Sequence, residues 1–295
     1  MNQTISFLRE IRDRQEYIPY STIYHSIADM RDKFVPSAKL NKGHYIDRVR
    51  INASETDLFT KEEQISYIHD PEIIEKYVGF GRANAEKQAV FYGAVESPEI
   101  KQPRVVAYFE TSELFRRSEG LPDNVTEIFT LSRWRIMEDI EVMEMIFSDE
   151  ALKSSEYARM SLAHQSGNYK HLPLAEEYEE QGRFFSNEFS RNDVKKGESH
   201  KYKIAAAYAN YIWSKTQMRG VTYPSVQSIY KGQNVALLPE LVDKYLKLES
   251  VGVFKFERKD GVNLPINSIY LATDLGIDNN AFKYIDYKGE DHLPK

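Results

Sequence analysis

A glycine and an arginine stand together in Gly81-Arg82-Ala83-Asn84, shortly before the aromatic pair of Phe91-Tyr92-Gly93-Ala94. Glycine lets a backbone turn tightly, so the guanidinium of Arg82 can be held in one place to bind a phosphate. Tyr92 offers a ring that can stack on a flat ligand, although an ordinary core tyrosine is the alternative. Asn84 is a weaker candidate for a substrate contact, because it can equally satisfy a turn.

Two more arginines lie in a short strand-like segment, residues 44–51. In a strand, Arg48 and Arg50 project from the same face, with Val49 opposite. Two neighbouring cations repel each other unless an anion or a carboxylate lies between them, which indicates a binding site. The alternative for each arginine is a surface ion pair of little energetic consequence.

A carboxylate, Glu110, follows the apolar run 105–109. This run predicts a buried strand, and residues 110–117 predict a helix, so we expect Glu110 at a strand-to-helix junction. A carboxylate can stabilise the positive charge that develops on a ribose when its glycosidic bond breaks. The alternative is a solvated glutamate in the first turn of a helix, where the helix dipole favours it.

A serine far downstream, Ser225, follows Tyr223 and Pro224. The proline has a fixed φ and favours an extended conformation at Tyr223, so the serine hydroxyl is presented from a rigid segment. Such a hydroxyl can orient a ligand. A serine that bonds its own backbone in a turn is the alternative.

Taken together, these positions resemble the RES domain family, named for its arginine, glutamate and serine. The resemblance covers roughly residues 42–257, and its longest matching stretch is GVTYPSVQSIYKGQNVALLPELVDKYLKLESV. It implies a fold similar to the ADP-ribosyltransferase toxins and NAD as the substrate. It also implies a cognate DNA-binding antitoxin as a partner.

The resemblance implies a role for each candidate residue in an NAD glycohydrolase or NAD phosphorylase that uses no metal. Glu110 matches the catalytic glutamate, Arg48 is the first choice for the family's arginine, and Arg50 fits the same place. Arg48, Arg50 and Arg82 are expected to bind the diphosphate, while Tyr92, Tyr223 and Ser225 position nicotinamide and ribose, with Asn84 as a further contact. Transfer of ADP-ribose to a macromolecule and a non-catalytic interaction protein are the alternatives.

The elements that must position these residues predict an α+β chain with mixed sheets flanked by helices. Residues 1–40 show helical spacing, which predicts a helical N-terminal extension (1–41) before a RES-like NAD-binding domain (42–295). Segments 128–136 and 235–238 predict strands, and 140–147 predicts a strand or a helix. Segments 174–190 and 200–218 predict helices, joined by a polar and mobile loop. A helix is expected from Pro239 to about Glu249 and is ended by Gly252, and Phe254 and Phe256 alternate with charges as in a half-buried strand.

Composition narrows the class of protein. The formal net charge is −6, which argues against nucleic acid or an anionic membrane as a partner. There is no cysteine, no window of ~18 apolar residues and no secretory signal, so we expect a soluble cytoplasmic protein. The seven histidines form no metal-binding pattern, and no dinucleotide glycine fingerprint is present. A homo-oligomer is left open.

Overall fold

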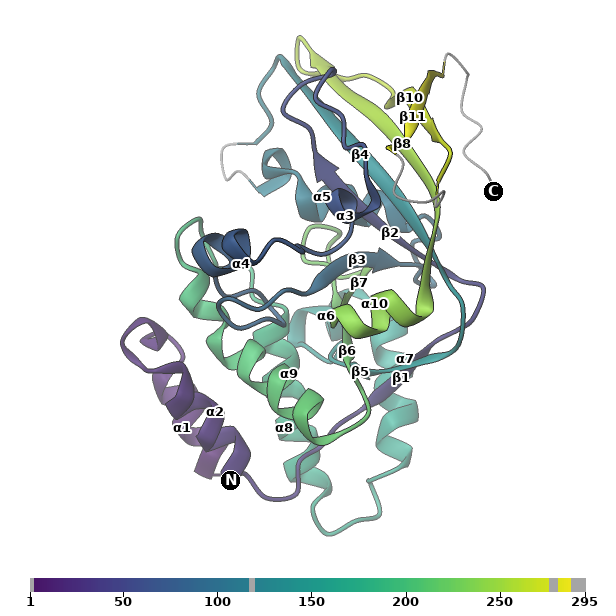
Figure 1. Ribbon diagram of the computed structural model, residues 1–295. Helices are drawn as coiled ribbons and strands as arrows, with labels where there is room; N and C mark the ends of the chain where they lie inside the picture. Colours follow the sequence, from purple (N-terminus) through teal and green to yellow (C-terminus); the bar gives the residue numbers. More distant parts are fainter. Residues whose placement is uncertain (1–2, 117–119, 276–280, 288–295) are drawn as a thin grey trace.

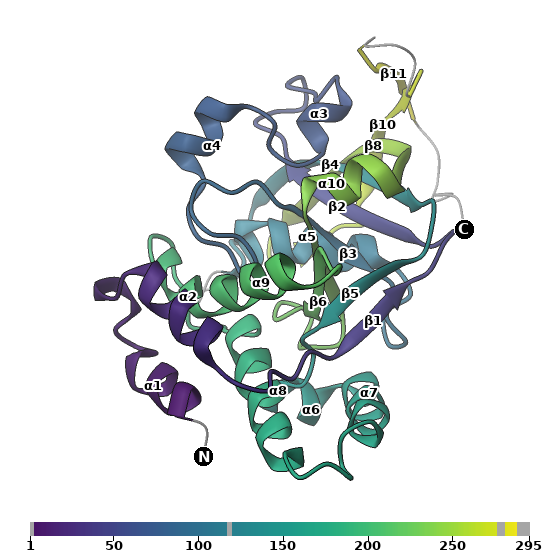
Figure 2. The ribbon, with the colours of Figure 1, turned by 60° about the horizontal axis from the view of Figure 1, so that its bottom comes forward.

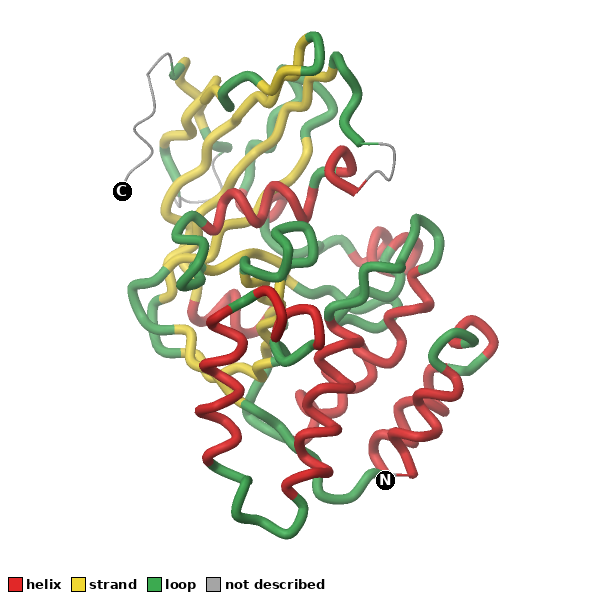
Figure 3. Tube along the Cα trace, turned by 180° about the vertical axis from the view of Figure 1, so that it is seen from behind, coloured by secondary structure: helices red, strands yellow, loops and turns green. Residues whose placement is uncertain are grey.

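A computed structural model describes residues 3–116, 120–275 and 281–287 (Figure 1). Within these ranges the chain is an α+β protein with one open, mixed sheet of 11 strands and helices at its N-terminus. Figure 3 shows the helices gathered towards one end of the molecule and the long strands towards the other.

The strands follow the order β1-β5-β6-β7-β3-β2-β4-β8-β10-β11, with β9 paired to β8. Among the described strands, β5 and β6 pair in parallel and the other pairs are antiparallel. Their bounds are β1 Ser37–Leu40, β2 Tyr45–Ile51, β3 Phe91–Val95, β4 Val125–Ile136, β5 Ile140–Glu144, β6 Gly220–Pro224, β7 Gln233–Leu237, β8 Leu246–Lys259, β9 Val262–Asn263, β10 Asn267–Thr273 and β11 Lys283–Asp286.

Ten α-helices and three 3-10 helices lie in the described part of the chain. The α-helices are α1 Gln3–Ile11, α2 Tyr20–Asp29, α3 Glu62–Ile65, α4 Pro71–Tyr77, α5 Pro103–Thr111, α6 Asp149–Ser154, α7 Glu156–Gly167, α8 Ala175–Phe189, α9 Lys203–Lys215 and α10 Pro239–Tyr245. The 3-10 helices are η1 Gln15–Tyr17, η2 Glu113–Arg116 and η3 Ser199–Tyr202.

The N-terminal helices close one end of the main core. Ile5 and Leu8 of α1 and Ile23 and Ile27 of α2 are fully buried in the same apolar cluster as α8 and α9. Figure 2 shows α2 lying beside α9, outside the sheet. The apolar spacing that predicted these two helices is therefore the face that they bury.

Two further apolar clusters lie on opposite faces of β2. Val49 packs with Val106, Ala107 and Tyr108 of α5, and Ile46 packs with Trp134 and with residues of α10. Successive side chains of a strand point to opposite faces, so this alternation places α5 on one side of the sheet and α10 on the other.

The structure confirms several predicted elements. Segments 44–51, 128–136 and 235–238 correspond to β2, β4 and β7, and 174–190 and 200–218 correspond to α8 and α9. Segment 140–147, predicted as a strand or a helix, forms β5. Phe254 and Phe256 lie in β8 as expected, and both are buried.

Three predictions were wrong. Residues 105–109, predicted as a strand, lie in helix α5. A short apolar run fits a buried helix as well as a buried strand, so the sequence pattern does not distinguish the two. Gly252 does not end a helix, since α10 ends at Tyr245 and the chain continues as β8, paired along its length with β4. Within the expected helical segment 1–40, residues 37–40 form β1 and pair with β5. The division at residue 41 stays a prediction.

Candidate functional site

The site begins where β2 and β3 separate. These strands pair only at Ile46↔Val95 and Asp47↔Ala94, whereas β2 and β4 stay paired to Ile51. The guanidinium of Arg48 lies at this separation, donates from Nη1 to the carbonyl oxygen of Tyr92 at 2.5 Å and lies 5.2 Å from the centre of the Phe91 ring. A backbone carbonyl and an aromatic face therefore hold its charge.

Arg50 projects from the same face of β2 but has different partners. It donates to the carbonyl oxygen of Gln64, and its guanidinium lies 5.2 Å from the centre of the Phe59 ring. Burial, and then repulsion from Arg50, lower the pKa of Arg48 to about 9. Burial also lowers the pKa of Arg50. The two cations therefore act on each other across one face of β2, as their spacing in the sequence predicts.

Glu110 and Ser225, 115 positions apart in the sequence, are in direct contact. The Ser225 hydroxyl donates to Glu110 Oε1 at 2.7 Å, and the backbone N–H of Gln227 donates to the same oxygen at 3.4 Å. Ser225 is fully buried and Glu110 is half-buried. The carboxylate is thus held by a fixed hydroxyl and remains partly open to its surroundings.

The prediction that Glu110 lies at a strand-to-helix junction was wrong. Glu110 lies in the last turn of α5, one residue before the helix ends at Thr111. The C-terminal end of a helix carries partial negative charge, so the helix dipole disfavours a carboxylate there. The first-turn explanation of this glutamate is therefore excluded, and its bonds to the Ser225 loop hold it instead.

The loop that follows Ser225 adopts an unusual backbone conformation. Ile229 and Tyr230 have φ angles of 54° and 61°, in the left-handed region that β-branched and bulky residues rarely adopt. The Ser225 N–H donates to the carbonyl of Gly232 at 2.8 Å, and the Tyr230 N–H donates to the carbonyl of Ser225 at 2.9 Å. These bonds close the loop and hold the Gln227 N–H against Glu110. Such strain persists only where surrounding contacts enforce it, and it is typical of functional loops.

Arg82 is anchored at the end of a helix. Its guanidinium donates to the carbonyl oxygens of Phe189 and Arg191, at 2.8 and 2.9 Å, at the C-terminal end of α8, where a cation is favoured. It also lies 5.1 Å from the centre of the Tyr202 ring and 5.9 Å from that of Tyr223.

The electrostatic surroundings of Arg82 include the candidate carboxylate. Burial, the largest single influence, lowers the pKa of Arg82, but Tyr202, Glu110 and two further tyrosines outweigh it, so the pKa is raised overall. Glu110 is therefore close enough to Arg82 to favour its charged form, and Arg82 is a cation at neutral pH.

Tyr92 and Asn84 hold the shape of the loop that carries Arg82. The Tyr92 hydroxyl donates to Asn84 Oδ1 at 2.7 Å and accepts from the Ala83 N–H at 3.1 Å. Asn84 Nδ2 donates to the carbonyls of Gly79 and Ala85, each at 2.8 Å. A Cβ at Gly81 would lie 2.2 Å from Asn84 Oδ1 and 2.7 Å from the Tyr92 hydroxyl, so the glycine is needed for close approach. Both side chains therefore position the loop, and the substrate contact predicted for them stays a prediction.

Tyr223 of β6 completes the cluster. It is 4% exposed and lies beside Phe189, with ring centres 5.9 Å apart. Burial raises its pKa well above the ordinary value, and Glu110 acts in the same direction. Tyr223 therefore stays neutral, and its ring lies beside the guanidinium of Arg82.

The structure thus brings together most of the predicted residues, but not all of them. The cluster consists of Arg82, Asn84, Tyr92, Glu110, Tyr223 and Ser225. Arg48 contacts it through the carbonyl of Tyr92. Arg48 and Arg50 share the face of β2 that carries Ile46, whereas α5 packs on the opposite face through Val49. Arg50 contacts Gln64 and Phe59, which are not members of the cluster.

Two residues that contact the cluster, Tyr202 and Gln227, were missed by the sequence analysis. Tyr202, whose ring flanks Arg82, ends the 3-10 helix η3 after a segment predicted as a mobile loop, and no local pattern marks it. Gln227 contributes through its backbone N–H, which any residue type can supply. Its place in the longest matching stretch was the one available signal.

A cavity of about 450 Å³ borders the cluster. Arg191 and Tyr230 line it, and the same residues contact Arg82 and Ser225 through their backbones.

In the described residues no group of three or more histidine and acidic side chains could hold a metal ion. Within the same residues, no helix is long and apolar enough to cross a membrane. Comparison with protein-family models and with curated proteins found no match.

Proposed function

We propose that this chain is an NAD-consuming enzyme of the RES type, which cleaves the bond between nicotinamide and ribose. The observation that carries the proposal is the contact between Glu110 and the buried Ser225 hydroxyl at 2.7 Å, beside the fixed cation Arg82. The open mixed sheet that separates between β2 and β3 fits the ADP-ribosyltransferase-like fold that this proposal requires.

The chemistry assigns a role to each group. Breaking the glycosidic bond develops positive charge on the ribose, and the Glu110 carboxylate stabilises it. Nicotinamide leaves with the bonding electrons as a neutral pyridine, so it needs no proton. Water adds to the ribose carbon and releases one proton, which gives ADP-ribose; inorganic phosphate adds there instead in phosphorolysis. The Ser225 hydroxyl, which donates its proton to Glu110, orients the carboxylate.

Diphosphate recognition is assigned first to Arg82. Its guanidinium has five N–H groups, and the two bonds to backbone carbonyls leave donors for a phosphate. Arg48 lies on the face of β2 opposite to α5 and contacts the cluster through the Tyr92 carbonyl, so it is assigned to the diphosphate for a ligand that extends to the separation of β2 and β3. Arg50 keeps its predicted role only if the ligand passes through that separation, because its contacts lie with Gln64 and Phe59.

Incubation of the purified protein with NAD tests the proposal. We expect free nicotinamide, with ADP-ribose in plain buffer or a phosphorylated ADP-ribose when phosphate is present, each identified by mass. Arg82→Ala should weaken the calorimetric NAD affinity more than Arg50→Ala does. If the protein neither releases nicotinamide nor binds NAD, the proposed enzyme activity is contradicted and the interaction-protein alternative is left. A transfer of ADP-ribose to protein would appear as an ADP-ribose mass added to an acceptor. An antitoxin partner and a cytoplasmic location are also part of the proposal.

A further inference from the structure

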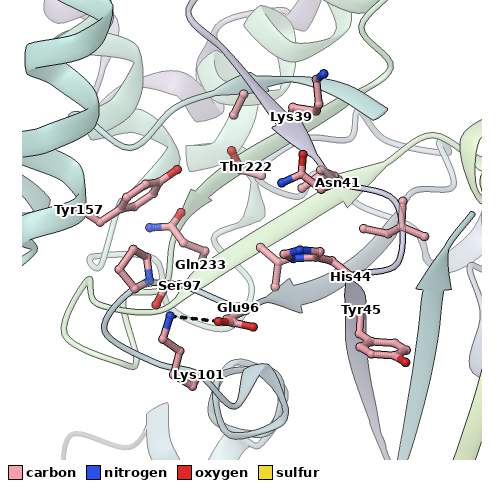
Figure 4. A pocket seen from close by; sticks show the side chains of 15 residues that line it. Lys39, Asn41, His44, Tyr45, Glu96, Ser97, Lys101, Tyr157, Thr222 and Gln233 are labelled. Carbon is pink, nitrogen blue, oxygen red and sulfur yellow. Dashed lines mark ion pairs between the residues drawn. The ribbon is translucent and has the colours of Figure 1, made fainter. Parts of the chain in front are cut away.

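A second cavity, of about 320 Å³, lies at the ends of several strands. Its walls come from β1 and the turn to β2, from the segment that follows β3, from the end of β4 and from helix α7 (Figure 4). Thr222 of β6 and Gln233 of β7 form its floor. Its volume falls in the range of ~300 to 1,000 Å³ that is typical of small-molecule sites.

This cavity is distinct from the Glu110 site, because the sheet lies between them. Thr222 lines the cavity, whereas Tyr223, the next residue of β6, flanks Arg82. Adjacent residues of a strand point to opposite faces. Val95 and Ile136, which also line the cavity, belong with Val235 and Leu237 to the α10 side of the sheet.

The amide of Gln233 is the unusual feature of this cavity. Gln233 is 3% exposed, and neither its Nε2 nor its Oε1 has a hydrogen-bond partner among the described residues. Figure 4 shows the amide projecting from β7 between Tyr157 and Ser97. Buried amides of this kind are nearly always hydrogen-bonded, so an unpaired donor beside an unpaired acceptor indicates a ligand contact.

Two polar groups beside the amide, the hydroxyls of Tyr157 and Ser97, are already engaged. The Tyr157 hydroxyl donates to the buried Glu144 at 2.8 Å, so Tyr157 offers only its ring to the cavity. The Ser97 hydroxyl donates to the carbonyl of Lys231 at 2.8 Å. Thr222 reaches a carbonyl only at 3.4 Å. Gln233 therefore carries the specificity of the cavity, and Thr222 can assist it.

The two lysines that line the cavity, Lys39 and Lys101, contribute little to ligand recognition. Lys101 pairs with Glu96 at 3.0 Å and Lys39 pairs with Asp139 at 3.3 Å, and all four side chains are substantially exposed. Exposed pairs of this kind contribute little and leave no fixed cation to recognise an anion. The recognised part of a ligand is thus its neutral, hydrogen-bonding edge.

We propose that this cavity binds a small planar molecule whose edge presents a hydrogen-bond donor beside an acceptor, as a nucleobase or a primary carboxamide does. The Gln233 amide has the complementary edge and forms two parallel hydrogen bonds with it, the arrangement that glutamine adopts with adenine. The ring of the ligand packs against Tyr157 and the apolar wall of Val95 and Ile136.

Calorimetry with adenine and with nicotinamide tests the site and distinguishes the two sources of such an edge. At least one of them should bind in a 1:1 ratio. Purine lacks the amino donor of adenine, and nicotinic acid, a carboxylate at neutral pH, lacks the amide donor of nicotinamide. Purine and nicotinic acid should therefore bind at least tenfold more weakly than adenine and nicotinamide, respectively. Gln233→Leu should weaken binding at least tenfold, and Gln233→Glu, which keeps the size but loses the donor, should do the same. Gln102→Leu, at an exposed glutamine, is the matched control and should bind as the wild type does.

The inference does not depend on the NAD activity, and its failure is separable from a failure of that activity. Adenine and nicotinamide are also parts of NAD, so binding in the Glu110 site would survive Gln233→Leu. That result would overturn the proposal, as would a wild-type protein that binds neither compound at millimolar concentration. With the proposal correct, Gln233→Leu weakens adenine or nicotinamide binding, and any release of nicotinamide from NAD changes by less than twofold.

Discussion

Buried polar side chains lie on both faces of the sheet around β6 and β7, and the two faces differ in how far the protein itself supplies their hydrogen-bond partners. On the face of Glu110, the Ser225 hydroxyl, the Tyr92 hydroxyl and the Arg82 guanidinium each have protein partners between 2.7 and 2.9 Å. On the opposite face, the buried Gln233 amide has no partner in the described part of the chain.

This difference distinguishes two ways of preparing a site. Around Glu110, internal hydrogen bonds fix the positions of charged groups, so stabilising a developing charge requires little rearrangement. Around Gln233, a ligand supplies the hydrogen bonds that the fold leaves unmade. Substitutions in the first region should therefore remove function or stability, while one in the second should improve stability when no ligand is bound.

The largest effect is expected for Glu110→Gln. The amide keeps the oxygen that accepts from Ser225 but loses the negative charge, so nicotinamide release should fall by a factor of ~10² to 10³ with little change in thermal stability. Steady-state assay of nicotinamide measures the rate. Glu113→Gln, at an exposed glutamate three residues further on, is the control and should retain full activity. Full activity in a folded Glu110→Gln protein would contradict the role given to this carboxylate.

The next largest effect is expected for Gly81→Ala, which should destabilise the loop that carries Arg82 on the Glu110 face of the sheet. The added Cβ meets Asn84 Oδ1 and the Tyr92 hydroxyl, so the hydrogen bond between them must break or the loop must move. Overpacking of this kind costs about 1–3 kcal/mol. Chemical denaturation measures the change in the free energy of unfolding, and the displaced Arg82 should also weaken NAD binding. Gly167→Ala, where an added Cβ meets nothing within 4 Å, is the control, and equal stability of the two variants would show that the loop is not held as described.

Tyr223→Phe should change how stability depends on pH. Because burial raises the pKa of Tyr223, the folded state keeps a proton that the unfolded state loses above its ordinary pKa of about 10. The resulting stability is fully present below about pH 10 and decreases by about 1.4 kcal/mol per pH unit as the pH rises towards the folded pKa. In Tyr223→Phe this decrease should be smaller when denaturation is measured between pH 9 and 11, whereas Tyr17→Phe, at a tyrosine 79% exposed, should leave it unchanged.

The smallest expected effect has the opposite sign. Gln233→Leu removes a buried amide without partners and replaces it with an apolar side chain of similar size, so the ligand-free protein should gain about 1 kcal/mol of stability. Denaturation in the absence of added ligand measures it. A loss of stability of similar size would mean that the amide is satisfied within the protein, and the contrast between the two faces would then disappear.

Several parts of the fold could be predicted because their signals are local. The alternation in 44–51 predicted β2 and the shared face of Arg48 and Arg50, and the apolar spacing of 174–190 and 200–218 predicted α8 and α9. The apolar run 105–109 was misjudged, because five apolar residues fit either a strand or a helix until their packing partners are known.

The candidate residues themselves, Arg82, Tyr92, Glu110, Tyr223 and Ser225, were identified from the sequence, because residue type and a resemblance can be seen without a structure. The sequence also determined which side chains share a strand face. Tertiary structure alone decided which face meets which layer. It placed Arg50 beside Phe59, brought the Tyr202 ring against Arg82, and left the Gln233 amide without a partner in a cavity of the described residues. The physical reason is that periodicity records local geometry, whereas burial and hydrogen-bond partners depend on contacts between residues more than a hundred positions apart, such as Glu110 and Ser225.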